Sequence, residues 1–347
     1  MPLRDLPPLR IGGLSFDPPV VMAPMAGVSE SPYRIIALEM GAGMTPTELV
    51  SAKGLQYANA RTEAYLRHDS VREPILAVQL YGGDPEAMAD AAERVVERGA
   101  QLVDVNMGCP VKKVTRNQAG SALMLEPEKA AAVVASMAKR VSVPVTAKLR
   151  SGWDEDQKNA PELGARLRDA GAAAIALHAR TRAQGYEGQA DWRMIERLRV
   201  AVPDVPVIAN GDVDGPDAAD AVVDQTGCDA VMVGRAALGN PWIFRALRAR
   251  HRGEAPPAPP RSEEQIAIIL RHFRASLVHA GPERGLKKFR THLSWYSRSL
   301  RGGARFRERV MQIEAPAEVE AAIRGFFGSA EIGRQEVAEY DPRVAYG

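Results

Sequence analysis

Short apolar runs, each followed by a polar turn and a segment of helical periodicity, repeat along residues 20–234. Eight near-even strand–helix units favour a closed (β/α)8 TIM barrel in the α/β class over the alternative, a doubly wound open sheet. The apolar runs that predict strands are VVMAP (20–24), MTPTELV (44–50), ILAVQL (75–80), LVDVNM (102–107), PVTAKL (144–149), AAIALH (173–178), VPVIAN (205–210) and DAVMVG (229–234).

The segments that flank this repeat have other patterns. LRIGGLSFDPPV (9–20) has a Gly-Gly turn between apolar runs and predicts a hairpin that closes the barrel bottom. The Pro-rich stretch 251–260 predicts a linker after a catalytic domain of residues 1–250. Residues 261–330 open with SEEQ, which matches a capping box, and continue with apolar residues at helical spacing, so they predict a small all-helical domain. Residues 331–347 are left as a C-terminal tail.

Composition limits the classes of function. The chain has 347 residues and a net charge of +2, and no stretch approaches the roughly 18 apolar residues of a membrane span. Because the first ten residues lack an apolar signal core, we expect a cytoplasmic protein. Two cysteines far apart argue against a disulfide framework and cannot form a zinc site unaided, so no metal is expected. A polyanion must be met by a local basic patch, and no obligate protein partner is evident.

Mostly polar residues form a ring at the C-terminal ends of the predicted strands, where barrels carry their functional groups. Such a ring would be costly if it were buried without partners, which favours a ligand site. The last two loops, ANGDVDG and VGRAALGNP, contain glycines and precede helices, an arrangement that binds phosphate, and Arg235 can add a charged contact. The ring consists of Pro24, Met25, Ala26, Gln79, Asn106, Lys148, His178, Asn210, Gly211, Asp212, Gly234 and Arg235.

Lys148 has two interpretations at the centre of a barrel. It could form a Schiff base, as in barrel aldolases. It could instead place a fixed positive charge beside a flavin, whose reduced ring becomes anionic. Gln79 and Asn106 would suit the polar edge of that ring, and we favour the flavin.

Seven motifs then carry a specific resemblance: APMAGVSESPYR, VQLYGGDP, VDVNMGCPVKKV, AKLRSGWD, LHARTRAQGYEG, IANGDV and VGRAALGNPWIF. In this order they resemble the tRNA-dihydrouridine synthases, nearest the bacterial DusB-like branch. The resemblance implies an oxidoreductase acting on CH–CH groups, in which an FMN-bearing barrel reduces uridine in tRNA with NADPH. It implies FMN contacts at all the ring residues except Asn106. The contact at His178 is inferred from a family motif that here reads HART, with Ala179 in place of the commoner glycine.

Cys109 lies in a polar loop just beyond the strand at 102–107. Reduction of a C5–C6 double bond needs a hydride at one carbon and a proton at the other. A thiol with a pKa near ~8.5 is protonated at neutral pH and suits a general acid. The alternative is a buried small hydrophobe, but the polar loop favours the acid, and the resemblance places Cys109 at the proton-donor position. Cys228 precedes the last strand and is predicted to pack.

Two further residues are interpreted as substrate contacts. Asn106 could bond the uracil edge or the flavin, and Arg180 could contact substrate or phosphate. Hydrogen bonding within the loops is the alternative for both.

The helical domain concentrates positive charge. Residues 271–309 hold eleven basic and two acidic residues. Leu286, Phe289 and Leu293 fall on one helix stripe, and the basic residues fall on the other side. The alternative is an ordinary solvated face, but the scarcity of acids favours RNA binding. The predicted tRNA contacts are Lys287, Arg290 and Trp295, and Lys112, Lys113 and Arg116 would extend the basic surface to the barrel mouth.

Two other functions remain open from the residues: an FMN barrel that reduces a free small molecule, and an RNA-binding protein without catalysis. The basic helix argues against the first. The combination of Cys109, Lys148 and His178 argues against the second.

Overall fold

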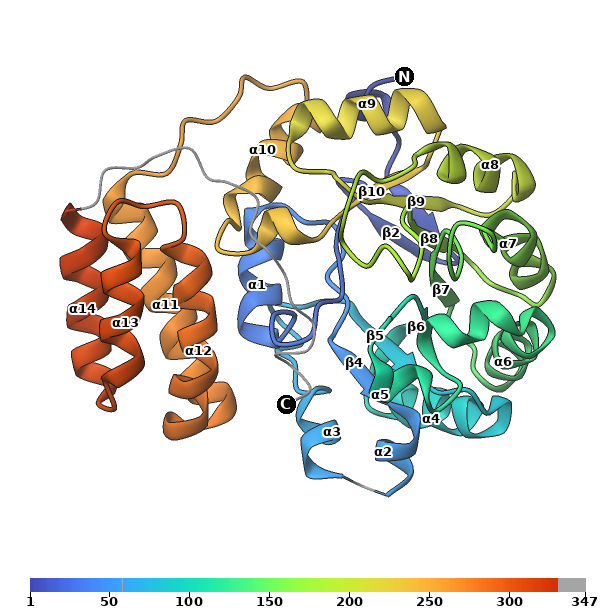
Figure 1. Cartoon of the computed structure of the whole chain (residues 1–347), viewed down its shortest axis with the longest axis horizontal. Coiled ribbons are helices and arrows are strands. Elements are labelled where there is room, and N and C mark those ends of the chain that lie inside the picture. Colours follow the sequence, from blue (N-terminus) through green and yellow to red (C-terminus); the bar gives the residue numbers. More distant parts are fainter. Residues whose placement is uncertain (58, 330–347) are drawn as a thin grey trace.

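The structure, a computed structural model, describes residues 1–57 and 59–329. Its main body is an eight-stranded parallel sheet that curls around an apolar core and is covered by helices (Figure 1). The strand order is β3-β10-β9-β8-β7-β6-β5-β4. The strands are β3 (Val20–Met22), β4 (Leu49–Ser51), β5 (Leu76–Tyr81), β6 (Ala100–Met107), β7 (Val145–Arg150), β8 (Ile175–His178), β9 (Val207–Asn210) and β10 (Ala230–Val233).

The sheet closes into a barrel through the segment that precedes β4. Val21 of β3 forms a parallel bridge with Met44, and the Met22 N–H donates to the Met44 carbonyl at 2.8 Å. The Thr47 N–H then donates to the Ala77 carbonyl of β5 at 2.9 Å. The segment that leads into β4 therefore bonds β3 on one side and β5 on the other, and the predicted (β/α)8 barrel is confirmed.

The strand predicted at 44–50 is shorter than expected. Regular pairing begins only at Leu49, and Met44 contributes a single bridge. Pro46 lies between them and has no N–H to donate to a neighbouring strand, which interrupts the ladder.

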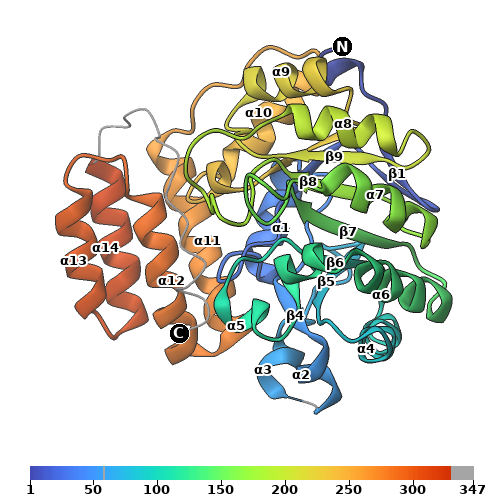
Figure 2. The same ribbon diagram turned by 45° about the vertical axis from the view of Figure 1, so that its right-hand side comes forward.

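Helices follow the strands and cover the outside of the barrel, as Figure 2 shows for α4, α6, α7 and α8. Each long helix turns its apolar stripe inward; α4, for example, buries Met88, Ala92 and Val95. The helices of this part are α1 (Ser31–Met40), α2 (Ala52–Gln56), α3 (Ala60–Ala64), α4 (Pro85–Glu97), α5 (Lys112–Thr115), α6 (Pro127–Arg140), α7 (Ala160–Asp169), α8 (Arg193–Ala201), α9 (Pro216–Thr226) and α10 (Trp242–His251), with short 3-10 turns η1 (Leu3–Asp5), η2 (Gly120–Leu125) and η3 (Arg235–Ala237).

The predicted N-terminal hairpin is present as β1 (Leu9–Ile11) and β2 (Leu14–Phe16). Its turn residue Gly12 has φ +57°, and a Cβ there would lie 2.7 Å from Pro144 Cγ. Because Pro144 directly precedes β7, the hairpin packs at the N-terminal end of that strand, the barrel bottom.

Beyond α10, residues 254–261 have no regular structure and lead to four helices, α11 (Ser262–Ala280), α12 (Pro282–Tyr296), α13 (Gly303–Gln312) and α14 (Pro316–Ser329). These helices form a separate layer beside the barrel (Figure 1) with a core of their own that includes Phe273, Phe289 and Phe327. The predicted tail, 331–347, lies outside the described residues. Among the described residues, none of the helices combines the length and apolar character needed to span a bilayer.

The predicted capping box is wrong. The residue before α11 is Arg261, whose side chain makes no cap hydrogen bond, and Ser262 is already inside the first turn. The last residue of the motif, Gln265, is buried.

The two layers meet through specific contacts. Tyr33 of α1 donates its hydroxyl to the Ala237 carbonyl, and its ring lies 5.2 Å from His272 and 5.8 Å from His292 of the helical domain. At the C-terminal end of α12, Gly239 approaches the Trp295 backbone so closely that a Cβ would lie 2.4 Å from the Trp295 carbonyl carbon.

Gly239→Ala should weaken this interface. Gly239 has φ +67°, so alanine adds left-handed strain of about 1–2 kcal/mol and overpacking of about 1–3 kcal/mol. Gly253 is a matched control, because it also has φ +67° but nothing lies within 4 Å of its Cβ position. We expect Gly239→Ala to lower the Tm more than Gly253→Ala and to speed proteolysis at residues 254–261. Equal effects of the two variants would contradict the close contact.

Candidate active site

A cavity of about 850 Å³ opens at the C-terminal ends of the barrel strands. Its floor and walls come from the ends of β6 to β10 and from the loop after β3. The predicted residues that line it are Pro24, Met25, Ala26, Asn106, Cys109, Lys148, His178, Arg180, Asn210, Gly211, Asp212, Gly234 and Arg235.

Gln79 lies elsewhere. It is fully buried and is not among the residues that line the cavity. Its Nε2 donates to Asp104 Oδ2 at 2.6 Å, and its Oε1 accepts from Asn106 Nδ2 at 2.9 Å.

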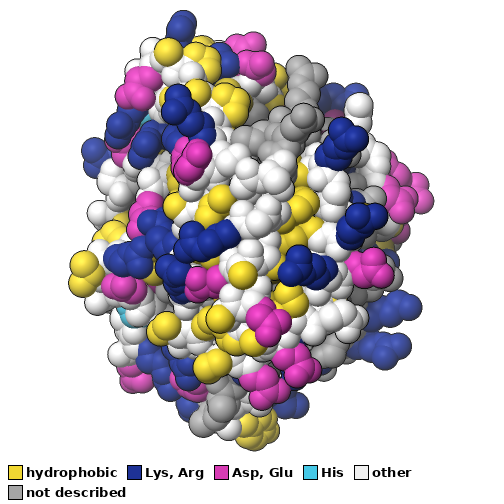
Figure 3. Space-filling view, turned by 90° about the vertical axis from the view of Figure 1, so that its left-hand side faces the viewer, with side chains coloured by type: hydrophobic (Ala, Val, Ile, Leu, Met, Phe, Trp, Pro, Cys, Tyr) yellow, Lys and Arg dark blue, Asp and Glu magenta, His cyan; other side chains and the backbone are white. Residues whose placement is uncertain are grey.

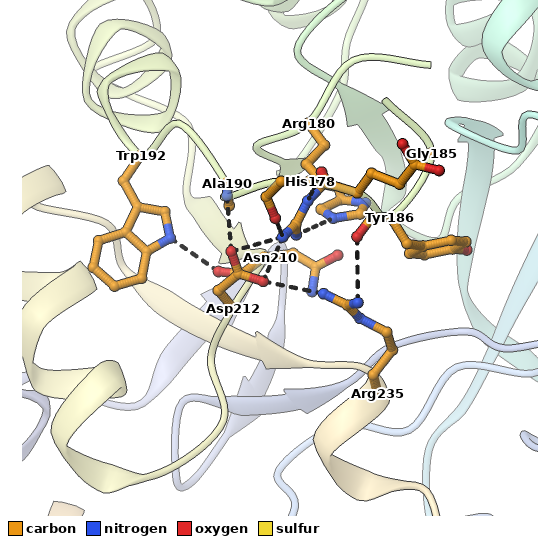
Figure 4. Close-up of polar contacts among 12 residues, drawn as sticks. His178, Arg180, Gly185, Tyr186, Ala190, Trp192, Asn210, Asp212 and Arg235 are labelled. Carbon is orange, nitrogen blue, oxygen red and sulfur yellow. Dashed lines mark hydrogen bonds and ion pairs between the residues drawn. The ribbon is translucent and has the colours of Figure 1, made fainter. Parts of the chain in front are cut away.

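Asp212 connects the last three strand ends. Arg180 Nη2 lies 2.8 Å from both carboxylate oxygens, and Arg235 Nη2 lies 3.1 Å from one of them. The Ala190 N–H also donates to Asp212 at 2.7 Å (Figure 4). Asp212 adopts φ +56°, a left-handed conformation that aspartate tolerates better than most residues. One carboxylate therefore holds two guanidinium groups toward the same cavity.

Lys148 and Asn210 share the barrel centre. The Lys148 ammonium donates to Asn210 Oδ1 at 3.0 Å, and Asn210 Nδ2 donates to the Met232 carbonyl at 2.8 Å. Burial, and to a smaller extent the nearby charge of Arg150, lower the pKa of Lys148, the carboxylate of Asp104 opposes both, and the resulting pKa is about 8. The side chain is thus a cation at neutral pH and can lose its proton as the pH rises above about 8.

His178 is held neutral. Burial lowers its pKa well below the usual value, and the surrounding cations Arg150, Lys148, Arg180 and Arg235 lower it further. Its ring lies 6.0 Å from that of Tyr186. A neutral imidazole can donate or accept one hydrogen bond inside the cavity.

The loop that carries Cys109 is braced on both sides of the residue. Asn106 Oδ1 accepts from the Cys109 N–H at 2.9 Å, and the Cys109 carbonyl accepts from the Ser121 hydroxyl at 3.0 Å. The Gly108 carbonyl accepts from Arg150 Nε at 2.8 Å. The side chain of Cys109 is 7% exposed and lines the cavity. Cys228 is fully buried, and burial raises the pKa of its thiol to about 11.

The sequence reasoning missed two residues of the site. Arg150 joins the loops after β6 and β8, because its Nε donates to the Gly108 carbonyl and its Nη1 donates to the carbonyls of Thr181 and Gly185. The Tyr186 ring lies between Arg150 and Arg235, 5.3 and 5.6 Å from their guanidinium carbons. Arg150 could have been found from the strand period, because it lies two residues after Lys148 on the same face.

The predicted basic helix is divided among several roles. Lys287 is exposed and pairs with Glu283 one turn away at 2.8 Å. Lys288 forms an ion pair with Glu30 of the barrel layer. Arg290 is half-buried and donates to the Ile313 carbonyl at 2.9 Å, and Trp295 packs against the barrel core. Lys287 thus faces solvent, whereas Arg290 and Trp295 take part in packing.

Comparison with known protein families identifies the family of this chain. The family model for dihydrouridine synthase (Dus) matches residues 21–331. The chain belongs to the dihydrouridine synthase family. It is 40% identical over 324 residues to the tRNA-dihydrouridine synthase B of Pseudomonas aeruginosa, covering 93% of this chain and 97% of that protein. It is 39% identical over 320 residues to the tRNA-dihydrouridine synthase B of Vibrio cholerae, covering 92% and 98%.

Solved structures share the fold. Morphinone reductase matches with a TM-score of 0.52 and 18% identity over 75% of this chain and 92% of that chain. A 2-naphthoyl-CoA reductase complex matches with a TM-score of 0.54 and 12% identity over 73% and 52%. At these identities the likeness concerns the architecture alone.

Asp212→Asn should destabilise this dihydrouridine synthase family member by about 2 kcal/mol, because hydrogen bonds to charged groups contribute roughly 1.5–3 kcal/mol. The substitution keeps an acceptor oxygen and tolerance of positive φ, but leaves Arg180, 2% exposed, without its counter-charge. Asp191→Asn is the control, because its partner Arg193 is 77% exposed and such pairs contribute about 1 kcal/mol or less. Denaturant unfolding measures both. Equal losses would mean that Asp212 is an ordinary surface ion pair.

Proposed function

We propose that this chain is a tRNA-dihydrouridine synthase that reduces the C5–C6 bond of uridines in tRNA, with bound FMN and with NADPH as reductant, in the cytoplasm. The proposal rests first on the family. It also rests on two relatives that match more than nine tenths of the chain and are named tRNA-dihydrouridine synthase B. The observation that carries it is that a cysteine on a hydrogen-bonded loop and a half-buried lysine face one cavity.

The cavity fits FMN in size and charge. Its volume lies within the usual range for cofactor sites, roughly 300–1,000 Å³. Five cationic side chains and three carboxylates line it, and the excess positive charge suits a phosphate. Met25 and Ala26 offer an apolar wall for a flat ring, whereas Gly211, at φ +118°, lets the backbone approach closely. Arg235 and the glycine loops would hold the phosphate, and Lys148 would face the ring.

The charged and polar residues that line the cavity have separate roles in the proposed reaction. When bound, the flavin would supply the hydride for C6, with NADPH as the source of its electrons. Lys148 contributes a fixed positive charge, which Asn210 orients. Arg180 and Arg235, held by Asp212, attract the phosphate groups of cofactor and substrate. His178 offers a hydrogen bond without adding charge.

Cys109 delivers the proton to C5 of the uracil. Its thiol lines the same cavity as Lys148, and a thiol is protonated at neutral pH unless a neighbour stabilises the thiolate. Asn106, which holds the Cys109 N–H, is the proposed contact to the uracil edge.

The tRNA is held by cations outside the cavity. A target uridine must leave its stack, at a cost of a few kcal/mol, which phosphate contacts can offset. Lys112, Lys113 and Arg116 are exposed directly after the Cys109 loop, and Arg284 and Lys287 are exposed on α12. The face of the helical layer that Figure 3 shows mixes Lys and Arg with Asp and Glu, so binding depends on where the cations lie rather than on uniform charge.

Cys109→Ala should abolish dihydrouridine formation while leaving flavin content and NADPH oxidation unchanged, because only the proton donor is removed. Cys109→Ser should also be poor, since a hydroxyl is a much weaker acid. The wild-type protein, purified with its flavin, is assayed with tRNA and NADPH, and dihydrouridine is measured by mass spectrometry of nucleosides. Protein that cannot be loaded with FMN, or that leaves uridine unreduced, would end the proposed function. Normal turnover by Cys109→Ala would end the acid role alone.

Arg284→Ala combined with Lys287→Ala should weaken tRNA binding and flatten its salt dependence. Each lost phosphate contact reduces the log–log slope by about 0.9 at most. Arg140→Ala is the control, because Arg140 ends α6 at the barrel bottom, where it pairs with Glu86, Asp90 and Glu93. Affinity is measured at several salt concentrations. Unchanged binding by the double variant would place the tRNA on another surface.

A further inference from the structure

A carboxylate is buried in the barrel wall, one level below the cavity. Among the described residues three carboxylates are buried, those of Glu48, Glu73 and Asp104, and only Asp104 lies within a barrel strand. A buried charge is costly unless hydrogen bonds and charges compensate it. Both neighbouring strands supply donors: Thr146 Oγ1 donates to Asp104 Oδ1 at 2.7 Å, and Gln79 Nε2 donates to Oδ2 at 2.6 Å.

Strand register puts these groups at one level. Gln79 of β5 pairs with Asp104 of β6, and Asp104 pairs with Thr146 of β7. Asn106 follows two residues later on the same face. Its Nδ2 donates to Gln79 Oε1 at 2.9 Å, and its Oδ1 accepts from the Cys109 N–H at 2.9 Å and the Gly108 N–H at 3.3 Å. A chain of hydrogen bonds therefore runs from Asp104 through two amides to the backbone of Cys109.

The direction of this chain is set at Asp104. An amide can turn by 180° and exchange its donor and acceptor ends, whereas a carboxylate only accepts. Because Asp104 accepts, Gln79 must point its NH₂ group toward it and its oxygen toward Asn106. Asn106 must then donate to Gln79, which leaves its oxygen for the N–H groups of Gly108 and Cys109. If both amides were reversed, the Asn106 NH₂ group would face the N–H groups of Gly108 and Cys109. Because all of these groups are donors, the two backbone N–H groups would lose their acceptor.

We propose that Asp104 is a positioning residue that fixes the orientation of the Gln79 and Asn106 amides and thereby holds the backbone of Cys109 in place for proton transfer. The inference rests on the proposed function, because it gives Cys109 the role of general acid. The carbonyls of the loop have separate anchors, since Arg150 holds Gly108 and Ser121 holds Cys109. The N–H groups of Gly108 and Cys109, in contrast, both donate to Asn106 Oδ1.

Three variants separate amide orientation from simple packing. Asp104→Asn keeps the size of the side chain but allows the chain to reverse. Asp104→Asn combined with Gln79→Glu moves the carboxylate one position along the chain, so that Asn106 must again donate and its oxygen must again face Cys109. Thr146→Val removes the other hydrogen bond of Asp104 and leaves the chain to Cys109 intact.

The main measurement is the rate at which iodoacetamide alkylates Cys109 in the purified protein, followed by peptide mass spectrometry. It requires neither tRNA nor turnover. Loss of one buried hydrogen bond corresponds to a change on the order of tenfold, so we expect Asp104→Asn to alkylate Cys109 about tenfold faster. We expect the double variant to return to nearly the wild-type rate and Thr146→Val to stay there. Cys228, fully buried, is the internal control and should react slowly in all four proteins.

Turnover with tRNA gives a second readout. Asp104→Asn should lower kcat and leave the KM for tRNA unchanged, because Gln79, Asp104 and Asn106 are buried inside the barrel, whereas the cations proposed to bind tRNA are exposed. A wild-type alkylation rate in Asp104→Asn would overturn the proposal. So would failure of the double variant to restore the rate, or equal acceleration at Cys228, which would indicate general loosening of the barrel. If wild-type protein makes no dihydrouridine but the alkylation pattern holds, the proposed function fails while the positioning of Cys109 stands.

Discussion

In-register pairing of the parallel strands is the constraint on which the site depends. Backbone hydrogen bonds place Gln79, Asp104 and Thr146 at one level of the barrel. They place Asn106 beside Lys148 one level higher. A shift of one residue in any of these strands would turn its polar side chains from the interior to the helix-covered outside. The polar chemistry of the cavity is therefore fixed by the same bonds that build the wall.

Several cations are buried around one cavity, and each needs polar partners to compensate for its lost contact with water. Lys148 and Arg150 have pKa values lowered by burial, and each is held by oxygen acceptors from another strand end. Asp212 supplies counter-charge for two arginines but leaves the cavity positive. Positive charge that is not neutralised within the protein is available for an anionic ligand, which is why we propose a phosphate-bearing cofactor and a nucleic acid as ligands.

The helical layer is coupled to the barrel through buried polar contacts as well as apolar ones. The buried ring of Tyr33 in α1 lies 5.2 Å from that of His272 and 5.8 Å from that of His292. Lys288 of α12 pairs with Glu30 at the start of α1. Glu48 lies fully buried near this pair, and burial, followed by the charge of Glu30, raises its pKa to about 8. The loop between Pro24 and Glu30 thus touches the cavity at one end and the helical layer at the other.

Hydrophobic periodicity by itself indicated eight strands, one of them too long, and the helical character of the region after residue 261, because strand and helix periods are local properties of the chain. The strand-end positions of Lys148, His178 and Asn210 followed from the same pattern. The Gly-Gly turn between apolar runs indicated the N-terminal hairpin. Tertiary structure decided the rest. The roles of Gln79, Arg290 and Trp295 depend on neighbours distant in the sequence, as do the interruption at Pro46 and the buried Gln265 of the supposed capping box. The sequence also does not reveal that Asp104, through two amides, reaches Cys109, because register between strands is set only when the barrel closes.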